Sequence, residues 1–329
     1  MTTSHPDLHI LVTGVTGYLG SRLVVPLLEA GHRVRVLTRD AGKLEGLPWA
    51  GDVEVAEGDA NDADDCRAAL ADIDVAYYLL HSMDGGGDLS QRDHEMAQTF
   101  ADAAADAKVG RIVYLGGLHP DDEELSEHLA SRVDVGEVFL DSPVPAAVLQ
   151  AAILIGAASA SFEMMRHLTD RLPAMVTPRW VNSRIQPIGI DDALYYLVGA
   201  ATLPPEVNRT FDIGGPDVLT YLQMMQQYAK ISGHHQRLIF VMPFLTPGLA
   251  SHWIGVVTPV PTGVAKPLIG SLVHDVVCQE TDLLDRLGPP PGGPTPYREA
   301  VRRAIAPADP HQSPPAAASL WPSDPDWAG

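Results

Sequence analysis

The sequence predicts an α/β fold in which a doubly wound parallel sheet is followed by a smaller carboxyl-terminal lobe. Apolar runs alternate with amphipathic segments through the first half of the chain, which is typical of a parallel sheet. A glycine-rich turn joins the first apolar run to the first amphipathic segment. The 329 residues are 46% hydrophobic, which is enough for a large core. Because crossovers between parallel strands are right-handed, we expect helices on both faces of the sheet.

The glycine turn runs from Thr13 to Gly20 with the spacing G-x-x-G-x-x-G. Gly14 allows the chain to turn sharply out of the strand, and Gly20 allows the helix to pack closely on it. Gly17 leaves room for a pyrophosphate, which would bind the free N–H groups at the start of the helix. The residues predicted to bind a dinucleotide here are Gly14, Thr16, Gly17, Tyr18, Leu19 and Gly20.

The remaining elements follow from the same alternation. The expected strands cover residues 8–12, 34–38, 53–57, 75–80, 111–115 and 146–151, with helices at about 19–30, 92–106 and 123–140. After residue 156 the pattern weakens, although a strand at 210–213 and a helix capped by Thr220 are expected. We therefore predict an NAD(P)-binding domain at 1–155 with a return segment at about 186–202, a substrate lobe at 156–304 and a disordered Pro- and Ala-rich tail at 305–329.

Arg39 follows the second strand, at the position that faces the adenosine ribose in a dinucleotide fold. An acidic residue there selects NAD, whereas an arginine accommodates a 2′-phosphate. Lys43 adds a second positive charge nearby, and the adjacent Asp40 opposes the assignment. We predict NADP(H) in preference to NAD(H); the alternative is a surface arginine at a strand end.

Two further segments lie where parallel strands end, at the edge that binds ligands in such folds. Asp59 would accept a hydrogen bond from the adenine amino group, or it is a turn aspartate that caps the helix starting near Asp62. His81 and Ser82 leave the fourth strand and either contact the cofactor or lie in a loop without a ligand. The cofactor-binding residues predicted here are Asp59, Ala60, Leu80 and His81.

The glycine turn, the Gly58-Asp59 pair and the segment at 186–193 resemble the atypical and extended short-chain dehydrogenase/reductase superfamily. The chain is most similar to bacterial NmrA-type reductases and to reductases named after sugar epimerases. The accessory NADPH-binding subunit of respiratory complex I is a more distant likeness. The resemblance covers about residues 8–300. It implies a Rossmann fold and a nicotinamide cofactor, and it leaves the substrate open.

The chain departs from this superfamily in its catalytic residues. Active members carry a Ser and a Tyr-x-x-x-Lys motif after the fifth strand, where this sequence has Gly116-Gly117 and then His128 with Arg132. These two residues are four apart, so they share a helix face. His128 is a candidate proton donor near neutral pH, and Arg132 would bind ribose hydroxyls or phosphate. The alternative is a solvent-exposed pair, or a relic without catalytic function.

Three functions follow from these residues. The first is an NADPH-dependent oxidoreductase acting on a small apolar carbonyl or enone-like substrate, with His128 or water supplying the proton. The second is a non-catalytic NADPH-binding redox sensor or assembly subunit, which the missing Ser and Tyr favour. A sugar-nucleotide epimerase comes last because it needs the same absent Tyr.

Composition limits the partners. The net charge of −20 and the absence of a basic stripe argue against nucleic acid. The two cysteines, Cys66 and Cys278, lack the spacing of a disulfide framework or zinc site, and no apolar leader is evident, so we expect a cytoplasmic protein. His234-His235 is not expected to bind a metal, because adjacent side chains point apart.

Residues 238–265 contain no Asp, Glu, Lys or Arg. Four prolines interrupt this stretch, so we expect an apolar lid or substrate wall rather than a transmembrane helix, with peripheral membrane contact as the alternative. Trp253 within it would stack on a substrate ring or pack in the core. The pairs Met164-Met165 and Met224-Met225 are expected to fill the core.

Overall fold

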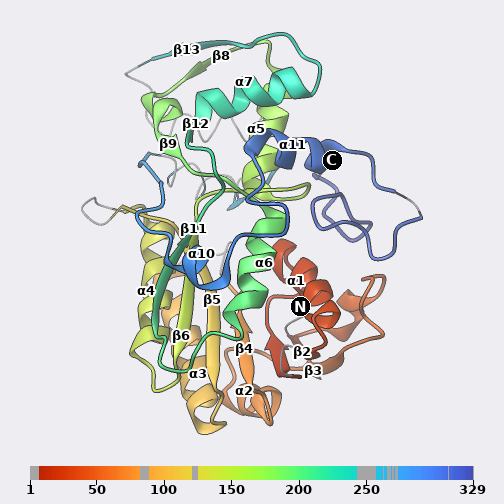
Figure 1. Ribbon diagram of the computed structural model, residues 1–329, viewed down its shortest axis with the longest axis vertical. Helices are drawn as coiled ribbons and strands as arrows, with labels where there is room; N and C mark the ends of the chain where they lie inside the picture. Colours follow the sequence, from red (N-terminus) through yellow and green to blue (C-terminus); the bar gives the residue numbers. More distant parts are fainter. Residues whose placement is uncertain are drawn as a thin grey trace.

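A parallel sheet of seven strands is the centre of the computed structural model, which describes residues 7–81, 89–120, 125–242, 257–261, 263, 264, 268, 270, 273–309 and 311–328 (Figure 1). The strand order is β11-β6-β5-β4-β1-β2-β3, and every pairing in the sheet is parallel. The prediction of a doubly wound sheet is therefore confirmed. The strands are β1 (His9–Val12), β2 (Arg33–Thr38), β3 (Glu54–Glu57), β4 (Val75–Tyr78), β5 (Arg111–Gly117), β6 (Ala146–Ala151) and β11 (Arg209–Ile213).

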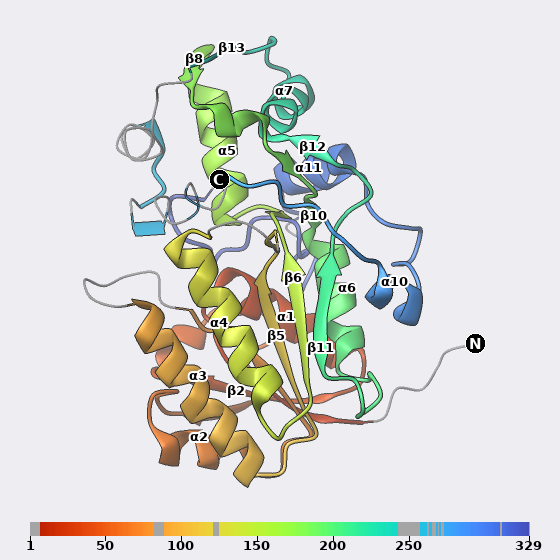
Figure 2. The ribbon, with the colours of Figure 1, turned by 90° about the vertical axis from the view of Figure 1, so that its left-hand side faces the viewer.

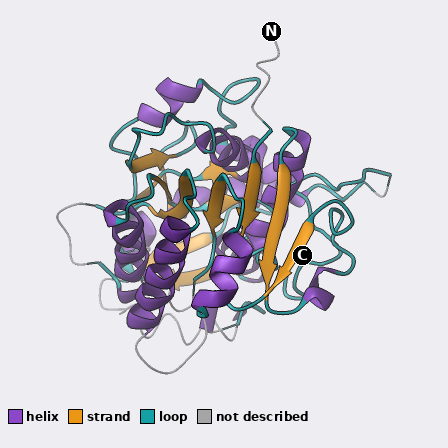
Figure 3. Ribbon diagram, turned by 90° about the horizontal axis from the view of Figure 1, so that it is seen from below, coloured by secondary structure: helices purple, strands orange, loops and turns teal. Residues whose placement is uncertain are grey.

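Helices cover both faces of this sheet, as Figures 2 and 3 show. One face packs against α1 (Tyr18–Glu29) and α6 (Ile190–Ala200), and the other against α2 (Ala63–Leu70), α3 (Leu89–Asp106) and α4 (Glu127–Asp141). Strand side chains alternate between the two cores: Ile10 and Val12 face the α1 side, whereas Leu11 faces the α2–α4 side. The central strands β1, β4, β5 and β6 thus bury both faces, which explains their nearly continuous apolar sequences, whereas the edge strand β3 is largely exposed.

A second lobe stands beyond the carboxyl ends of the strands (Figure 1). Its helices are α5 (Ala160–Arg171), α7 (Tyr221–Ile231) and α11 (Tyr297–Ile305), and its core contains the four predicted methionines, each 1% exposed. Thr220 caps α7 as predicted, forming a capping box with Gln223. The shorter elements are β7 (Leu154–Ile155), β8 (Ala174–Thr177), β9 (Arg184–Ile185), β10 (Ile188–Gly189), β12 (Leu219–Thr220), β13 (Leu238–Val241), α10 (Asp282–Leu287) and the 3₁₀ turns Ala41–Leu44 and Arg179–Asn182.

The segment predicted as an apolar lid is described only at its two ends. Residues 238–241 form β13, which pairs with β8, and the side chains of Leu238 and Phe240 are 60% and 59% exposed. Trp253 and the prolines at 243 and 247 lie outside the described residues, so the lid stays a prediction. Within the described part of the chain, no helix has the length and apolarity needed to cross a bilayer.

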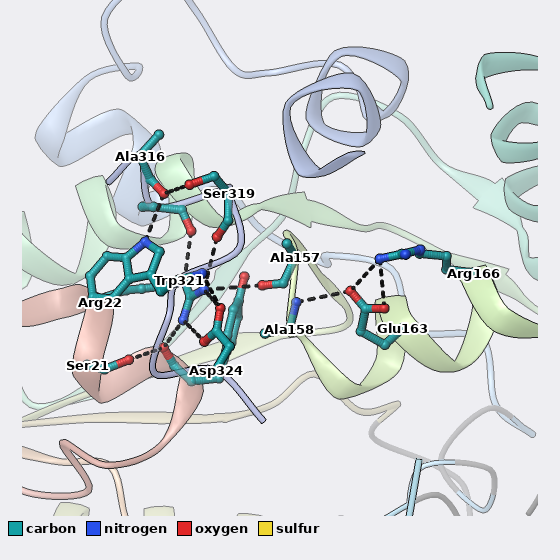
Figure 4. Close-up of polar contacts among 12 residues, drawn as sticks. Ser21, Arg22, Ala157, Ala158, Glu163, Arg166, Ala316, Ser319, Trp321 and Asp324 are labelled. Carbon is teal, nitrogen blue, oxygen red and sulfur yellow. Dashed lines mark hydrogen bonds and ion pairs between the residues drawn. The ribbon is translucent and has the colours of Figure 1, made fainter. Parts of the chain in front are cut away.

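The tail differs from the disorder predicted for residues 305–329. The side chain of Arg22 on α1 is fully buried, and its guanidinium donates two hydrogen bonds to the Asp324 carboxylate, of 2.9 and 2.7 Å. It also donates to the carbonyl oxygen of Ala317 at 2.8 Å. A further bond, of 3.1 Å, runs to the carbonyl oxygen of Ser319, which Figure 4 labels. The indole of Trp321 covers it, with the guanidinium carbon 4.8 Å from the ring centroid. The Pro- and Ala-rich composition of the tail predicted disorder, because composition carries no information about Arg22, the buried cation that binds the tail from far away in the sequence.

We expect Asp324→Asn to lower the free energy of unfolding by about 3 kcal/mol, because it leaves the buried Arg22 guanidinium without its counter-charge. Asp326→Asn is the matched control, since Asp326 is exposed two residues further along. Urea denaturation of both variants gives the difference. Equal stabilities would show that the ion pair does not hold the tail.

Candidate functional site

The glycine turn is fixed by close backbone contacts. Gly14 has φ +68°, and a Cβ there would lie 2.3 Å from the carbonyl oxygen of Leu79. A Cβ on Gly20 would lie 2.3 Å from the carbonyl oxygen of Gly14. A Cβ on Gly17 would meet that same oxygen at 3.2 Å, and nothing else within 4 Å. The first and third glycines are therefore required by the protein itself, whereas the second leaves space beside the turn.

The start of α1 presents free backbone donors at this space. Gly17 is the N-cap residue in an extended conformation, and no side chain caps the helix. Its carbonyl accepts from Ser21, while the N–H groups of the first turn have no intrahelical acceptor by geometry. These donors and the positive end of the helix dipole suit a diphosphate, so the residues present fit a dinucleotide.

One cavity of about 580 Å³ connects the turn with the carboxyl ends of β4, β5 and β6. Ten of the predicted site residues line it together: Gly14, Thr16, Gly17, Tyr18, Leu19, Gly20, Leu80, His81, His128 and Arg132. Arg39, Asp59 and Ala60 do not line it. The cavity therefore unites the pyrophosphate and catalytic candidates, and leaves the adenine-side candidates at its periphery.

The adenine-side residues have local partners. Asp59 accepts hydrogen bonds from the backbone and side-chain nitrogens of Asn61, at 3.0 and 2.7 Å, which lower the pKa of its carboxyl. This geometry agrees with the turn aspartate given as the alternative, although Asp62 and not Asp59 caps α2. The Asp40 carboxylate caps the 3₁₀ turn at Gly42 (2.9 Å), whereas the neighbouring Arg39 is exposed.

His128 and Arg132 lie on α4 and line the cavity opposite His81, with the two imidazole centroids 6.4 Å apart. Desolvation by the cavity walls, followed by the Arg132 charge, lowers the pKa of His128 to about 4. The same two causes lower the pKa of His81 to about 3, even though this side chain is accessible at the wall. At neutral pH the His128 imidazole is therefore in its neutral form, whose N–H group is able to donate a hydrogen bond. The catalytic role of His128 stays a prediction.

Gly117, at the end of β5, stands where the superfamily resemblance expects a serine. A Cβ on Gly117 would lie 2.6 Å from the terminal Cδ1 of Leu129, so a serine there would require the end of this flexible side chain to shift. Arg132 donates to the Leu115 carbonyl oxygen at 2.6 Å, and its Nε is buried with no hydrogen-bond partner. An acceptor on a bound molecule would satisfy this atom.

Several lining residues were missed by the sequence analysis. The start of α5 and the tail both line the cavity, through Ser159, Ala160, Ser161, Ser323, Asp324, Pro325 and Trp327. Leu47 and Lys43 line it as well. The tail did carry a signal, because two tryptophans within seven residues, Trp321 and Trp327, are unusual in a disordered segment.

From the sequence, the adjacent histidines His234 and His235 are not expected to bind a metal ion. His234 lies 2.9 Å from the Asp170 carboxylate. The described ranges contain no group of three or more His, Cys, Asp or Glu side chains arranged to hold a metal ion.

Residues 14–151 match a family described as NAD(P)H-binding. A 3β-hydroxysteroid dehydrogenase/Δ5→4-isomerase from Mycobacterium tuberculosis is 37% identical over 92 residues, which are 28% of this chain and only 24% of that relative. Two solved structures share the fold across the chain. Triphenylmethane reductase of Citrobacter sp. complexed with NADP(H) has a TM-score of 0.70 and 20% identity, covering 90% of this chain and all of that one.

The second is the NADPH-dependent quinone oxidoreductase of Escherichia coli complexed with NADPH. Its TM-score is 0.70 at 18% identity, covering 89% of this chain and 98% of that one. Identities this low show the fold alone, and the family match rests on the first half of the chain. Residues 14–151 therefore match an NAD(P)H-binding domain, and the chain shares its fold with these two structures over about nine-tenths of its length.

Proposed function

We propose that this protein is an NADPH-dependent oxidoreductase whose substrate is a small apolar carbonyl or enone-like compound. The observation that carries the proposal is the single cavity that joins the uncapped helix start to the His128–Arg132 pair. The proposal includes a cytoplasmic location, a cofactor domain at 1–155 with a return segment at 186–202, and a substrate lobe at 156–304.

Each part of the cavity has a role in this proposal. The amides at Tyr18 and Leu19 bind the diphosphate, while Arg39 and Lys43 bind the 2′-phosphate. The neighbouring Asp40 carboxylate, which counts against this role, accepts a hydrogen bond from the Gly42 amide. Asp59, Ala60, Leu80 and His81 remain proposed cofactor contacts. The bound nicotinamide supplies the hydride, as it does in oxidoreductases generally.

The substrate end of the cavity is apolar. Its side chains would exclude water and favour a hydrophobic acceptor; they are Leu118, Ile153, Leu154, Val264, Leu268 and Val276. The neutral His128 imidazole would donate a hydrogen bond to the acceptor oxygen, and water would supply the proton that completes the reduction. Arg132 would hold the ribose or the acceptor through its free Nε. The names of the two structural neighbours, a dye reductase and a quinone oxidoreductase, agree with an apolar acceptor.

The second candidate function is a non-catalytic NADPH sensor or assembly subunit. It is favoured by Gly117, which stands where the superfamily has its serine, and by the absence of the Tyr-x-x-x-Lys motif. An epimerase is not supported, because no tyrosine stands at position 128.

We expect the purified protein to oxidise NADPH with quinones or enones, and His128→Gln to lower kcat by about 10²-fold with unchanged NADPH affinity. Because the pKa of His128 is about 4, kcat should stay constant between about pH 5.5 and 8. His94→Gln is the control, since His94 pairs with Asp134 outside the cavity. Tight NADPH binding without turnover across the panel would establish the sensor instead.

Arg39→Ala should weaken NADPH binding by about 10- to 100-fold, because it removes a charge-assisted contact to the 2′-phosphate. NADH affinity should change by less than about threefold, and Arg33→Ala, at the other end of β2, should alter neither. Calorimetric titration with both nucleotides gives the answer. Equal weakening of NADPH and NADH would contradict the assignment.

Gly17→Ala should reduce dinucleotide affinity by at least about tenfold, because its methyl group occupies the space beside the turn. The melting temperature should change little, since φ at Gly17 is −89° and a Cβ meets only one atom. Gly51→Ala, in open space, is the matched control. Normal binding by the Gly17 variant would place the diphosphate elsewhere.

A further inference from the structure

We propose that residues 316–328, here called the carboxyl-terminal strap, are part of the dinucleotide site and retain the bound cofactor beside its diphosphate. Four strap residues line the cavity: Ser323, Asp324, Pro325 and Trp327. The inference rests on the proposed function only in requiring a dinucleotide in this cavity, and it does not depend on a reaction.

The first anchor of the strap is the helix that carries the glycine turn. Arg22 holds the Asp324 carboxylate through two hydrogen bonds, and one of the same guanidinium nitrogens lies 3.4 Å from the carbonyl oxygen of Tyr18. Tyr18 is the first residue of α1, so Asp324 lies close to the amides that would bind the diphosphate. The Ala157 amide donates to the Ala318 carbonyl oxygen at 3.0 Å and fixes the start of the strap.

The second anchor is α5 in the other lobe. His167, which is 7% exposed, makes a 3.0 Å hydrogen bond from Nε2 to the carbonyl oxygen of Trp327. Since an acceptor oxygen requires a donor, this bond places the imidazole proton on Nε2. The Trp327 side chain packs against the core of that lobe. The strap therefore links α1 to α5, and the first turns of both helices line the same cavity.

The loop between these anchors is also rigidly held. Ala158 has φ +69°, and its amide donates to the fully buried Glu163 carboxylate at 3.0 Å (Figure 4). Arg166 lies 3.2 Å from the same carboxylate and balances its charge. The strap thus rests against a loop of defined conformation, as a wall of a binding site must.

The positive charge of Arg22 explains why the Asp324 carboxylate can lie beside the proposed diphosphate site. A free carboxylate beside a diphosphate would repel it, but the Arg22–Asp324 pair is neutral overall. The side chains of this pair are 0% and 8% exposed, so bulk solvent does not screen their attraction. Asp324 can therefore close the site without opposing an anionic ligand. Because the strap is tied at both lobes, release of the cofactor past it requires an anchor to open, which slows dissociation.

Hydrogen exchange of the full chain with and without NADPH tests this inference without a variant. Bound NADPH should slow exchange both at residues 13–21 and in the strap, while residues 63–70 on α2 stay unchanged as the internal control. Protection of 13–21 without protection of the strap would overturn the inference and leave the proposed function intact. Protection of neither would remove the dinucleotide site, and both proposals with it.

Trp327→Ala provides the second measurement, because it removes a side chain from the cavity wall and leaves the Arg22–Asp324 pair in place. It should raise the dissociation rate of NADPH by about tenfold. Leu320→Ala is the matched control, since Leu320 is an apolar strap residue that does not line the cavity. Equal rates for both variants would overturn the inference. NADPH retained by the strap without reduction of any acceptor would overturn the catalytic proposal alone.

Discussion

The structure depends on the contact among three backbone segments at the glycine turn. The carbonyl oxygen of Gly14 lies where a Cβ of Gly20 would be, and the Leu79 carbonyl lies where a Cβ of Gly14 would be, both at 2.3 Å. Only glycine permits this approach. It brings the end of β1, the start of α1 and the end of β4 together. The position of α1 against the sheet, and hence the direction of its free amides, follows from this contact.

The same helix then serves two purposes one turn apart. Its first turn offers backbone donors to the cavity, while Arg22 in the next turn is buried against the strap. A buried ion pair adds little net stability over apolar packing, because both charges lose their hydration. Its value here is geometric: two hydrogen bonds and two ring contacts allow one arrangement of strap and helix. The contact at Gly14 thereby also determines where the tail lies.

At the end of the cavity that holds His128 and Arg132, burial changes the acid–base properties of His128. His128 stands where the superfamily resemblance expects a tyrosine, and a solvent-exposed imidazole would titrate near neutral pH. The cavity walls and Arg132 lower its pKa to about 4, so it offers a neutral N–H group. The end of the Leu129 side chain meanwhile packs beside Gly117. A neutral N–H group beside an apolar wall is the combination on which the proposed hydrophobic acceptor rests.

The sequence by itself determined the sheet, the turn at Gly14 to Gly20 and the shared face of His128 and Arg132, because periodicity and glycine spacing are local properties of the chain. It did not determine the pKa of His128, the partner of Asp59 or the order of the tail. Those depend on which atoms surround a group after folding, and Arg22 meets Asp324 across 302 residues of sequence. Tertiary structure alone decided these features, because burial and long-range charge pairing leave no local pattern in the sequence.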